Sequence, residues 1–272
     1  MPYIDIEGAR VHYTDSGESS WPVMVFAHGF FMDSSMFAPQ VEFVESRGVR
    51  ALCLDARGHG DTMSDPDRPF TYWDSARDML AVMDDAGVEH ATLVGMSQGG
   101  YTTLRTALLD PSRVDALVLL DTEASASTAE EKAGYQELFD AWTDPNVPLA
   151  TLADSLAPRL IGGTDADQAP WRAKWHSSDR PLIRPAANCL IERETLLDRL
   201  GEITCPAIVI RGEHDQTSTA EKSAVLAAGL PGANGVVTIP GAGHAANWTA
   251  PHLVNEVIGG FLKELSVGSP VR

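Results

Sequence analysis

The stretch that decides the fold is LVGMSQGGYTTL, residues 93–104, in which an apolar run ends at a serine enclosed by glycines. Its centre, Gly95-Met96-Ser97-Gln98-Gly99, matches a G-x-S-x-G pattern that fixes only three positions and arises by chance in many chains. Ser97 is either a nucleophile on a sharp turn or a small residue in an ordinary strand-to-helix connection. The flanking sequence has to decide between these two interpretations.

Short apolar runs that recur along the chain predict the strands of a mostly parallel sheet. Continuous runs, without alternation of apolar and polar residues, are typical of strands covered on both faces. They are VMVFA (23–27), RALCL (50–54), ATLVGM (91–96), VDALVLL (114–120), AIVIR (207–211) and the weaker VVTI (236–239). An alternating N-terminal segment that turns at Glu7-Gly8 predicts a hairpin, and its two strands bring the sheet to eight.

Helical patterns separate most of these strands. They cover residues 36–48, 72–87, 98–109, 219–229 and 253–265. Strands that alternate with helices indicate a parallel sheet with helices on both faces, which is the α/β class. Ser97 then lies between a buried strand and a helix, where the free N–H groups of the helix start favour developing negative charge. This context favours the nucleophile interpretation of Ser97.

Residues 122–204 interrupt the alternation of strands and helices. The segment contains no buried-strand pattern, begins with strong helix formers and then becomes rich in proline and tryptophan. We predict a mostly helical insertion at 122–204, which acts as a lid, within a core formed by residues 1–121 and 205–272. Its large apolar side chains should pack onto the core or form a small core of their own.

The charge of the chain limits the partners that we expect, and its cysteines indicate the redox compartment. With 38 acidic and 20 basic residues among 272, the formal net charge is −18, which disfavours binding to nucleic acid and to anionic membranes. The three cysteines are widely spaced and show no C-x-x-C pattern, as expected of free thiols in a reducing compartment. The N-terminus lacks a signal-peptide pattern, and we expect a cytoplasmic protein.

Two further strand ends supply partners for Ser97. A serine hydroxyl needs a base to take its proton and an acid to orient that base. His244 follows the last predicted strand and should emerge at the same carboxyl edge of the sheet as Ser97. For the acid, Asp215 is favoured, and Asp121, which directly follows an earlier strand, is the alternative. The chain order Ser97, Asp215, His244 is that of hydrolases with a nucleophile elbow.

Taken together, the motifs resemble the α/β-hydrolase superfamily over nearly the whole chain, especially its small lid-bearing esterases, enol-lactonases and carbon–carbon bond hydrolases. The motifs are AHGFF (27–31), DARGHGDT (55–62), GMSQGG (95–100), RGEHD (211–215) and GAGH (241–244). The resemblance implies the α/β-hydrolase fold, with a helical lid inserted after the sixth strand. It also implies an oxyanion hole made by the backbone N–H groups of Phe30 and Gln98.

Two departures from the family patterns reduce the number of reactions of this family that fit the sequence. The elbow carries Ser97 rather than an aspartate, which disfavours haloalkane dehalogenase and the usual epoxide hydrolase chemistry. The His28-Gly29 motif is followed by two phenylalanines, so the HGGG-type oxyanion loop of lipases is absent. We expect an apolar substrate pocket. Its predicted lining residues are Phe31, Met32, Met96, Trp142 and Trp248.

The sequence therefore predicts a serine hydrolase, independent of metal and cofactor, that cleaves a small, largely apolar carboxylic ester or lactone through an acyl-enzyme. One alternative is a carbon–carbon bond hydrolase of a vinylogous diketone with the same triad. Its acidic substrate would require a cation, for which Arg172, Lys174 and Arg184 are candidates. The other alternative is a hydrolase-fold ligand sensor that turns its ligand over about once. The pattern does not identify the substrate or the oligomeric state.

Overall fold

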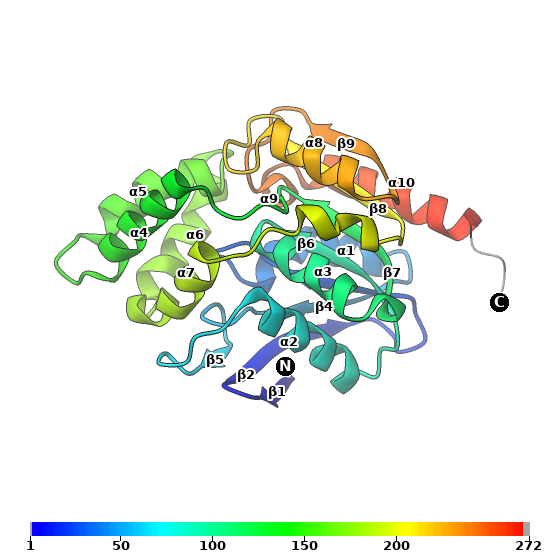
Figure 1. The fold of residues 1–272 in the computed structure, drawn as a ribbon, viewed down its shortest axis with the longest axis horizontal. Coiled ribbons are helices and arrows are strands. Elements are labelled where there is room, and N and C mark those ends of the chain that lie inside the picture. The colour runs from blue at the N-terminus through cyan, green and yellow to red at the C-terminus, as the bar shows by residue number, and fades with distance from the viewer. Residues whose placement is uncertain (1, 269–272) are drawn as a thin grey trace.

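A nine-stranded, mostly parallel sheet forms the centre of the molecule in the computed structural model, which describes residues 2–268 (Figure 1). Its strands are β1 (Tyr3–Ile6), β2 (Ala9–Ser16), β3 (Val23–Ala27), β4 (Arg50–Leu54), β5 (Met63–Ser64), β6 (Ala91–Met96), β7 (Val114–Leu120), β8 (Ala207–Gly212) and β9 (Ala233–Ile239). The order is β1-β2-β4-β3-β6-β7-β8-β9, and β5 pairs with β2. The pairs that β2 makes are antiparallel and all others are parallel. The α/β architecture is confirmed, and the two-residue β5 is an addition to the eight predicted strands.

Helices cover both faces of this sheet. Those of the core are α1 (Ala38–Glu45), α2 (Tyr72–Asp85), α3 (Gln98–Leu109), α8 (Ala220–Gly229), α9 (Ala246–Thr249) and α10 (Pro251–Gly268). The helix predicted over 36–48 is instead a short 3-10 helix, η1 (Ser34–Phe37), followed by α1. Pro39 lies in the first turn of α1, where a missing N–H is tolerated.

The core is divided into two layers, one on each face of the sheet. In β3, Met24 and Phe26 belong to the layer that α1 and α10 cover, whereas Val25 and Ala27 belong to the layer under α2, α3 and α8. The continuous apolar run of β3 is thus explained, because successive side chains point to opposite faces and both faces are buried.

Close backbone approaches around Ser97 explain its glycines. A Cβ on Gly95 would lie 2.5 Å from the carbonyl oxygen of Gly99, and a Cβ on Gly99 would overlap the carbonyl group of Ala27 at the end of β3. A Cβ on Gly100 would overlap the side chain of Thr122. The glycines therefore let α3 start directly against the neighbouring strands, and this fixes the height of Ser97 above the sheet.

We expect Gly99→Ala to destabilise the fold by at least about 3 kcal/mol, because its new methyl group would meet backbone that cannot move aside. The matched control is Gly134→Ala in α4 (Ala129–Thr143), where a Cβ meets nothing within 4 Å. Alanine there should stabilise the helix by up to about 1 kcal/mol. Urea unfolding followed by circular dichroism measures both changes. A Gly99→Ala protein as stable as the wild type would contradict this account of the turn.

A helical insertion separates β7 from β8 and lies at one end of the molecule (Figure 1). It contains α4, α5 (Leu149–Leu160), α6 (Asp165–Ser177), η3 (Arg180–Ile183), α7 (Arg184–Ile191) and η4 (Leu197–Glu202). Its large aromatic side chains, among them Phe139, Trp142 and Trp175, are buried together with Phe30 and Phe31 of the core. The insertion therefore packs onto the sheet through an aromatic cluster shared with the core.

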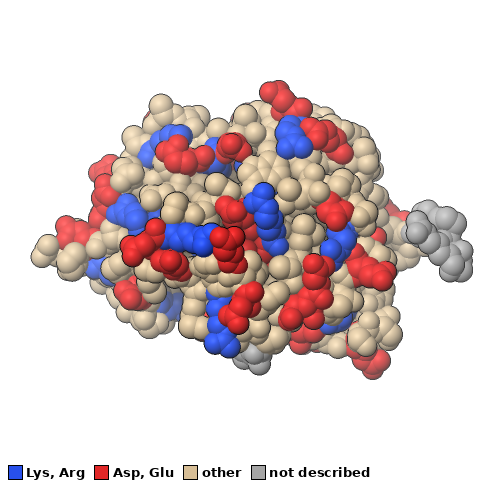
Figure 2. Space-filling model, turned by 60° about the horizontal axis from the view of Figure 1, so that its bottom comes forward, with Lys and Arg blue, Asp and Glu red and all other residues tan. Residues whose placement is uncertain are grey.

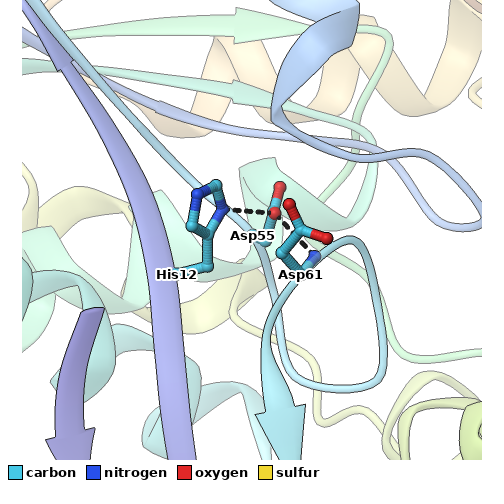
Figure 3. Close-up of side chains that lie close together, drawn as sticks. All are labelled: His12, Asp55 and Asp61. Atoms are coloured by element: carbon cyan, nitrogen blue, oxygen red, sulfur yellow. Dashed lines mark hydrogen bonds and ion pairs between the residues drawn. The ribbon is translucent and has the colours of Figure 1, made fainter. Parts of the chain in front are cut away.

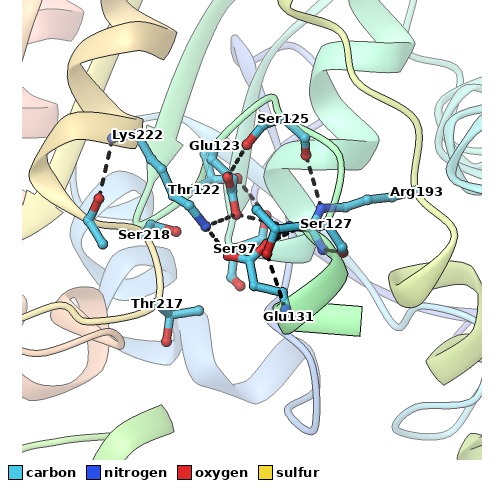
Figure 4. Close-up of polar contacts among 12 residues, drawn as sticks. Ser97, Thr122, Glu123, Ser125, Ser127, Glu131, Arg193, Thr217, Ser218 and Lys222 are labelled. Carbon is cyan, nitrogen blue, oxygen red and sulfur yellow. Dashed lines mark hydrogen bonds and ion pairs between the residues drawn. The ribbon is translucent and has the colours of Figure 1, made fainter. Parts of the chain in front are cut away.

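A buried ionic network joins the two ends of the insertion (Figure 4). Arg193, at its C-terminal end, donates to the carboxylate of Glu123 at 3.0 Å, and both side chains are almost completely buried. Lys222 of α8 donates to Glu123 at 2.9 Å and to Glu131 of α4 at 2.5 Å. Arg193 also bonds the hydroxyl of Ser127. These contacts tie the segments that enter and leave the insertion to each other and to the core.

Arg193→Met should destabilise the protein by about 3 kcal/mol or more, because Lys222 is then the one cation among residues 2–268 that pairs with the buried Glu123 carboxylate. Arg199→Met is the control, since Arg199 makes an exposed pair with Glu202 and its loss should change stability little. Thermal unfolding of both variants measures the difference. Equal midpoints for the two would mean that the network does not stabilise the fold.

Charged side chains of both signs are interspersed over the face shown in Figure 2. Lysine and arginine side chains lie beside aspartate and glutamate, so this face presents no continuous basic surface of the kind that binds polyanions. Within residues 2–268, no helix combines the length and the apolar character needed to cross a membrane.

Candidate active site

Ser97 occupies the turn between β6 and α3 in a strained conformation. Its φ of 51° lies in the left-handed region, which side chains other than glycine rarely adopt. Two contacts hold the turn. The Ser97 N–H donates to the carbonyl of Leu120 at 2.9 Å. The hydroxyl of Thr122, which Figure 4 shows beside Ser97, donates to the Ser97 carbonyl at 2.7 Å. The surrounding structure thus holds Ser97 in this strained turn, and its side chain is buried.

Ser97, His244 and Asp215 form one hydrogen-bonded series. His244 Nε2 lies 3.0 Å from Ser97 Oγ, and His244 Nδ1 lies 3.0 Å from both carboxylate oxygens of Asp215. The three residues come from the turn after β6, the loop after β8 and the loop after β9. The structure therefore brings all three predicted residues together at the carboxyl edge of the sheet, where open α/β sheets place their sites.

The surroundings of Asp215 keep its side chain ionised. Burial alone would raise the pKa of this carboxyl group, but the charge of His244 and hydrogen bonds from His244, Thr217 and Ser218 hold the pKa below its ordinary value. An ionised Asp215 accepts the Nδ1–H of His244 and leaves a lone pair on Nε2 toward Ser97. His244 is thereby oriented to take a proton from the serine.

Asp121, the alternative acid, does not contact the imidazole of His244. Its carboxylate oxygens accept backbone N–H groups from Gly212, at 2.6 Å, and Ala246, at 3.4 Å. The side chain is completely buried, and burial together with the charge of Asp215 raises its pKa well above the ordinary value. The geometry therefore favours Asp215 as the partner of His244.

Two backbone amides next to Ser97 are free to bind an oxyanion. Gln98 is the first residue of α3, and Phe30 follows the end of β3, which pairs with β6 through Ala27 and Gly95. Among residues 2–268, no group accepts a hydrogen bond from the backbone N–H of Phe30 or Gln98. Unused donors at a strand end and at a helix start are what a developing negative charge requires.

The predicted pocket residues lie in two places. Phe31 packs against Trp142 with ring centroids 4.2 Å apart, and both line a groove of about 1190 Å³ between the insertion and the core, as does Met32. Met96 is completely buried, with its sulfur directly against Gly29, and Trp248 packs edge-on against Trp171 of α6. Neither Met96 nor Trp248 lines the groove.

Contacts between the insertion and the segment after Phe30 were not predicted from the sequence. Trp175 of α6 donates its indole N–H to the carbonyl of Phe31 at 2.6 Å. Lys174 donates to Asp33 at 2.5 Å and to the hydroxyl of Ser35 at 2.8 Å. The tryptophans of this segment were expected to pack onto the core or within the insertion, but nothing in the sequence indicates these particular partners.

The other two basic residues considered for an acidic substrate are engaged in ion pairs of the insertion. Arg172 contacts Asp165 and, at 3.8 Å, Asp154. Arg184 contacts Asp140 at 3.0 Å and the carbonyl of Phe139 at 2.8 Å. Each guanidinium group is thus already paired with neighbouring carboxylate or carbonyl oxygens.

One group of side chains has the spacing of a metal site, but its hydrogen bonds explain its arrangement. The ligand atoms of His12, Asp55 and Asp61 lie within 4.8 Å of one another (Figure 3). The Asp55 carboxylate accepts from His12 Nδ1 at 2.7 Å and from the backbone N–H groups of Ser34 and Asp61 at 2.7 and 2.9 Å. Asp55 therefore fixes the loop after β4, and its donors use the oxygens that a metal would need.

A mostly parallel sheet that carries a buried serine, histidine and aspartate in series at its carboxyl edge defines the class of α/β hydrolases. The chain belongs to the α/β hydrolase fold family, whose family model matches residues 22–251. The match spans the strands and loops that carry Ser97, Asp215 and His244.

Individual relatives are similar over almost the whole chain. The 2-(acetamidomethylene)succinate hydrolase of Mesorhizobium japonicum is 28% identical, with 95% of this chain and 94% of that protein covered. The 2-hydroxy-6-oxononadienedioate/2-hydroxy-6-oxononatrienedioate hydrolase of Comamonas testosteroni is also 28% identical, with 93% and 91% covered. The crystal structure of the enol-lactonase from Burkholderia xenovorans LB400 superposes with a TM-score of 0.83, at 28% identity, with 96% and 100% covered. These relatives are hydrolases, and the chain has the class of activity of a hydrolase.

Proposed function

We propose that this protein is a serine hydrolase that cleaves a small, largely apolar carboxylic ester or lactone through an acyl-enzyme, without a metal or cofactor. The observation that carries the proposal is the 3.0 Å contact between Ser97 Oγ and His244 Nε2, with Asp215 on the other side of the imidazole. A base at this distance can take the hydroxyl proton as the oxygen attacks.

In the first half of the reaction, Ser97 Oγ attacks the carbonyl carbon while His244 Nε2 takes the hydroxyl proton. Asp215 stabilises the resulting imidazolium without taking its proton. The backbone N–H groups of Phe30 and Gln98 bind the oxyanion of the tetrahedral intermediate, and each such donor contributes roughly 3–4 kcal/mol in comparable sites. The intermediate collapses when His244 gives its proton to the leaving alkoxide.

In the second half, water takes the place of the alcohol. His244 removes a proton from the water molecule as its oxygen attacks the acyl carbon, and the same two amides bind the second oxyanion. Proton return from His244 to Ser97 Oγ releases the carboxylic acid and restores the free site. For a lactone, the alcohol and the acid leave as one molecule.

The surroundings of the site support an apolar, uncharged substrate. Phe30, whose amide is one of the two proposed oxyanion donors, belongs to a cluster of contacting rings. The other members are Phe31, Phe139 and Trp142. The enol-lactonase of Burkholderia xenovorans, whose fold superposes over 96% of this chain, is a relative named as a lactonase. We infer that the insertion acts as a lid and supplies this apolar wall.

A second candidate is hydrolysis of a vinylogous diketone, because the Comamonas testosteroni relative is named for a hydroxy-oxo dienedioate. Such a substrate is a dicarboxylate and needs cations to bind it. Lys174, Arg172 and Arg184 are the cations considered for that task, and each is already paired with a carboxylate. This pairing is the reason for placing the ester or lactone first.

A substrate panel tests the proposal. Aryl esters of short and long acids, lactones, and dienoate diketones are incubated with the wild type, and initial rates are compared. The proposal expects repeated turnover of at least one ester or lactone, with a burst of the alcohol product where deacylation is slow. Turnover of the diketones alone would favour the second candidate. A single turnover followed by an occupied site would favour a ligand sensor.

A further inference from the structure

Asp121 lies at the junction of the two loops that carry Asp215 and His244. Its Oδ1 accepts the N–H of Gly212, three residues before Asp215, at 2.6 Å. Its Oδ2 accepts the N–H of Ala246, two residues after His244, at the longer distance of 3.4 Å. One side chain from the end of β7 therefore contacts the backbone of both loops.

The backbone of Asp121 is held as firmly as its side chain. Its φ of 46° lies in the left-handed region, which costs free energy for a residue other than glycine. The N–H donates to the carbonyl of Ile210 at 2.8 Å, and the carbonyl accepts the hydroxyl of Ser218 at 2.8 Å. A strained conformation that the neighbours fix so completely indicates a specific task for the side chain.

The charges around Asp121 favour a protonated, neutral carboxyl group on this residue. The side chain is fully buried, and within residues 2–268 it forms no ion pair with a lysine, arginine or histidine. Asp215, which interacts with Asp121, is already ionised and paired with His244. The guanidinium group of Arg211 donates to backbone carbonyls, that of Asp215 at 3.2 Å and that of Glu213 at 3.4 Å, and to neither carboxyl group. Two adjacent buried carboxyl groups that have one histidine as partner, hydrogen-bonded to only one of them, do not both ionise.

The hydrogen bonds of the two carboxyl groups indicate which oxygen of each is available for this proton. Asp215 Oδ1 accepts the N–H groups of Thr217 and Ser218 in addition to His244, whereas Oδ2 accepts from His244 alone among residues 2–268. On Asp121, Oδ1 is occupied by the short bond from Gly212, and Oδ2 has only the long contact with Ala246. Asp215 Oδ2 thus has a free lone pair, and Asp121 Oδ2 has room for the proton.

We propose that Asp121 is a positioning residue which stays a neutral carboxylic acid and donates its O–H to the Asp215 carboxylate, holding the acid and the base of the site in line. The inference rests on the proposed function. Hydrogen bonding between the two carboxyl groups is consistent with the raised pKa of Asp121. If Asp121 lost its proton, a second negative charge would lie beside Asp215 and would hold a proton on His244, which then could not act as a base.

Three variants test the role of Asp121 in turnover of p-nitrophenyl acetate or another hydrolysed panel ester. Asp121→Asn keeps a donor and an acceptor, and we expect a kcat within about threefold of the wild type. Asp121→Ala should lower kcat at least about tenfold with KM unchanged, because it removes alignment rather than substrate binding. Asp121→Asn should also extend activity to higher pH, since the amide cannot ionise. The exposed Asp198→Asn is the control and should change neither kcat nor the pH profile.

The pH dependence of stability tests the proton itself and needs no substrate. A carboxyl group whose pKa is raised in the folded state holds a proton that the unfolded chain has released, so its contribution to stability falls as pH rises above about 4. In Asp121→Asn the amide cannot ionise, so the variant does not lose stability in this way as the pH rises. The Tm difference between Asp121→Asn and the wild type should therefore grow in favour of the variant from pH 5 to pH 8, and Asp198→Asn should show no such trend.

Each outcome supports or overturns the inference. An Asp121→Asn protein as inactive as Asp215→Asn would mean that Asp121 acts as an ionised acid. Wild-type kcat in Asp121→Ala, or a Tm difference for Asp121→Asn that does not change with pH, would remove the role proposed. The failure of the proposed function is separate: it would appear as turnover by Ser97→Ala, whereas the Tm comparison is independent of turnover.

Discussion

Replacing Ser97 by alanine should lower the turnover of a hydrolysed ester by roughly 10⁵- to 10⁶-fold, which is the cost of losing the nucleophile in comparable serine hydrolases. The remaining activity would come from the oxyanion amides and from substrate binding. The fold should persist, because alanine leaves the backbone contacts of the turn to Leu120 and Thr122 in place. Steady-state rates and thermal unfolding measure the two halves of this expectation.

A second serine gives a matched control for this substitution. Ser223 of α8 is also buried, and within the described part of the chain its hydroxyl has no hydrogen-bond partner. Ser223→Ala should leave turnover unchanged and stability equal or slightly higher, since an unpaired buried hydroxyl is unfavourable. Covalent labelling by a fluorophosphonate should occur in Ser223→Ala and fail in Ser97→Ala. Full ester turnover by Ser97→Ala would contradict the proposed mechanism.

Asp215→Asn should lower kcat by about 10⁴-fold with little change in KM, because an amide in this place no longer holds His244 in the tautomer that accepts a proton at Nε2. The amide also removes the negative charge that stabilises the imidazolium during the reaction. Rates measured over a range of substrate concentrations separate the two constants.

The same measurement on Asp121→Asn decides between the two candidate acids. The structure places Asp215 against His244 Nδ1 and leaves Asp121 hydrogen-bonded to backbone N–H groups. A loss of activity in Asp121→Asn alone, with Asp215→Asn unaffected, would reverse the assignment.

The sheet was predictable because its central strands are buried on both faces. Runs such as VMVFA (23–27) and ALVLL (116–120) contain no polar residue on either side of the strand, which is the pattern of a strand covered on both faces. Strand β5 gave no such signal, because Met63 and Ser64 pair only with Arg10 and Ala9 at the edge of β2. Edge pairing depends on where the loop after β4 returns, and that is a tertiary property.

The site was predictable to the extent that it depends on strand ends. Ser97, Asp215 and His244 each lie in the turn or loop after a recognisable strand, and parallel strands bring such residues to one edge. Contacts made by the insertion had no local signal. Arg193 and Glu123 are 70 positions apart, and nothing in either segment indicates the other. Met96 had two compatible placements, and the packing against Gly29 decided for the buried one.

The bond from the Trp175 indole to the Phe31 carbonyl couples two motions that would otherwise be independent. The Phe31 carbonyl lies one residue beyond the amide of Phe30. Trp175 is a buried residue of α6, one of the helices of the insertion. When α6 shifts away from the core, it has to break this 2.6 Å bond or draw the Phe31 peptide along with it. The left-handed φ of 62° at Phe31 leaves the loop little freedom to absorb such a pull. If the insertion moves as the proposed lid, its opening and a displacement of the proposed oxyanion donor at Phe30 are therefore coupled.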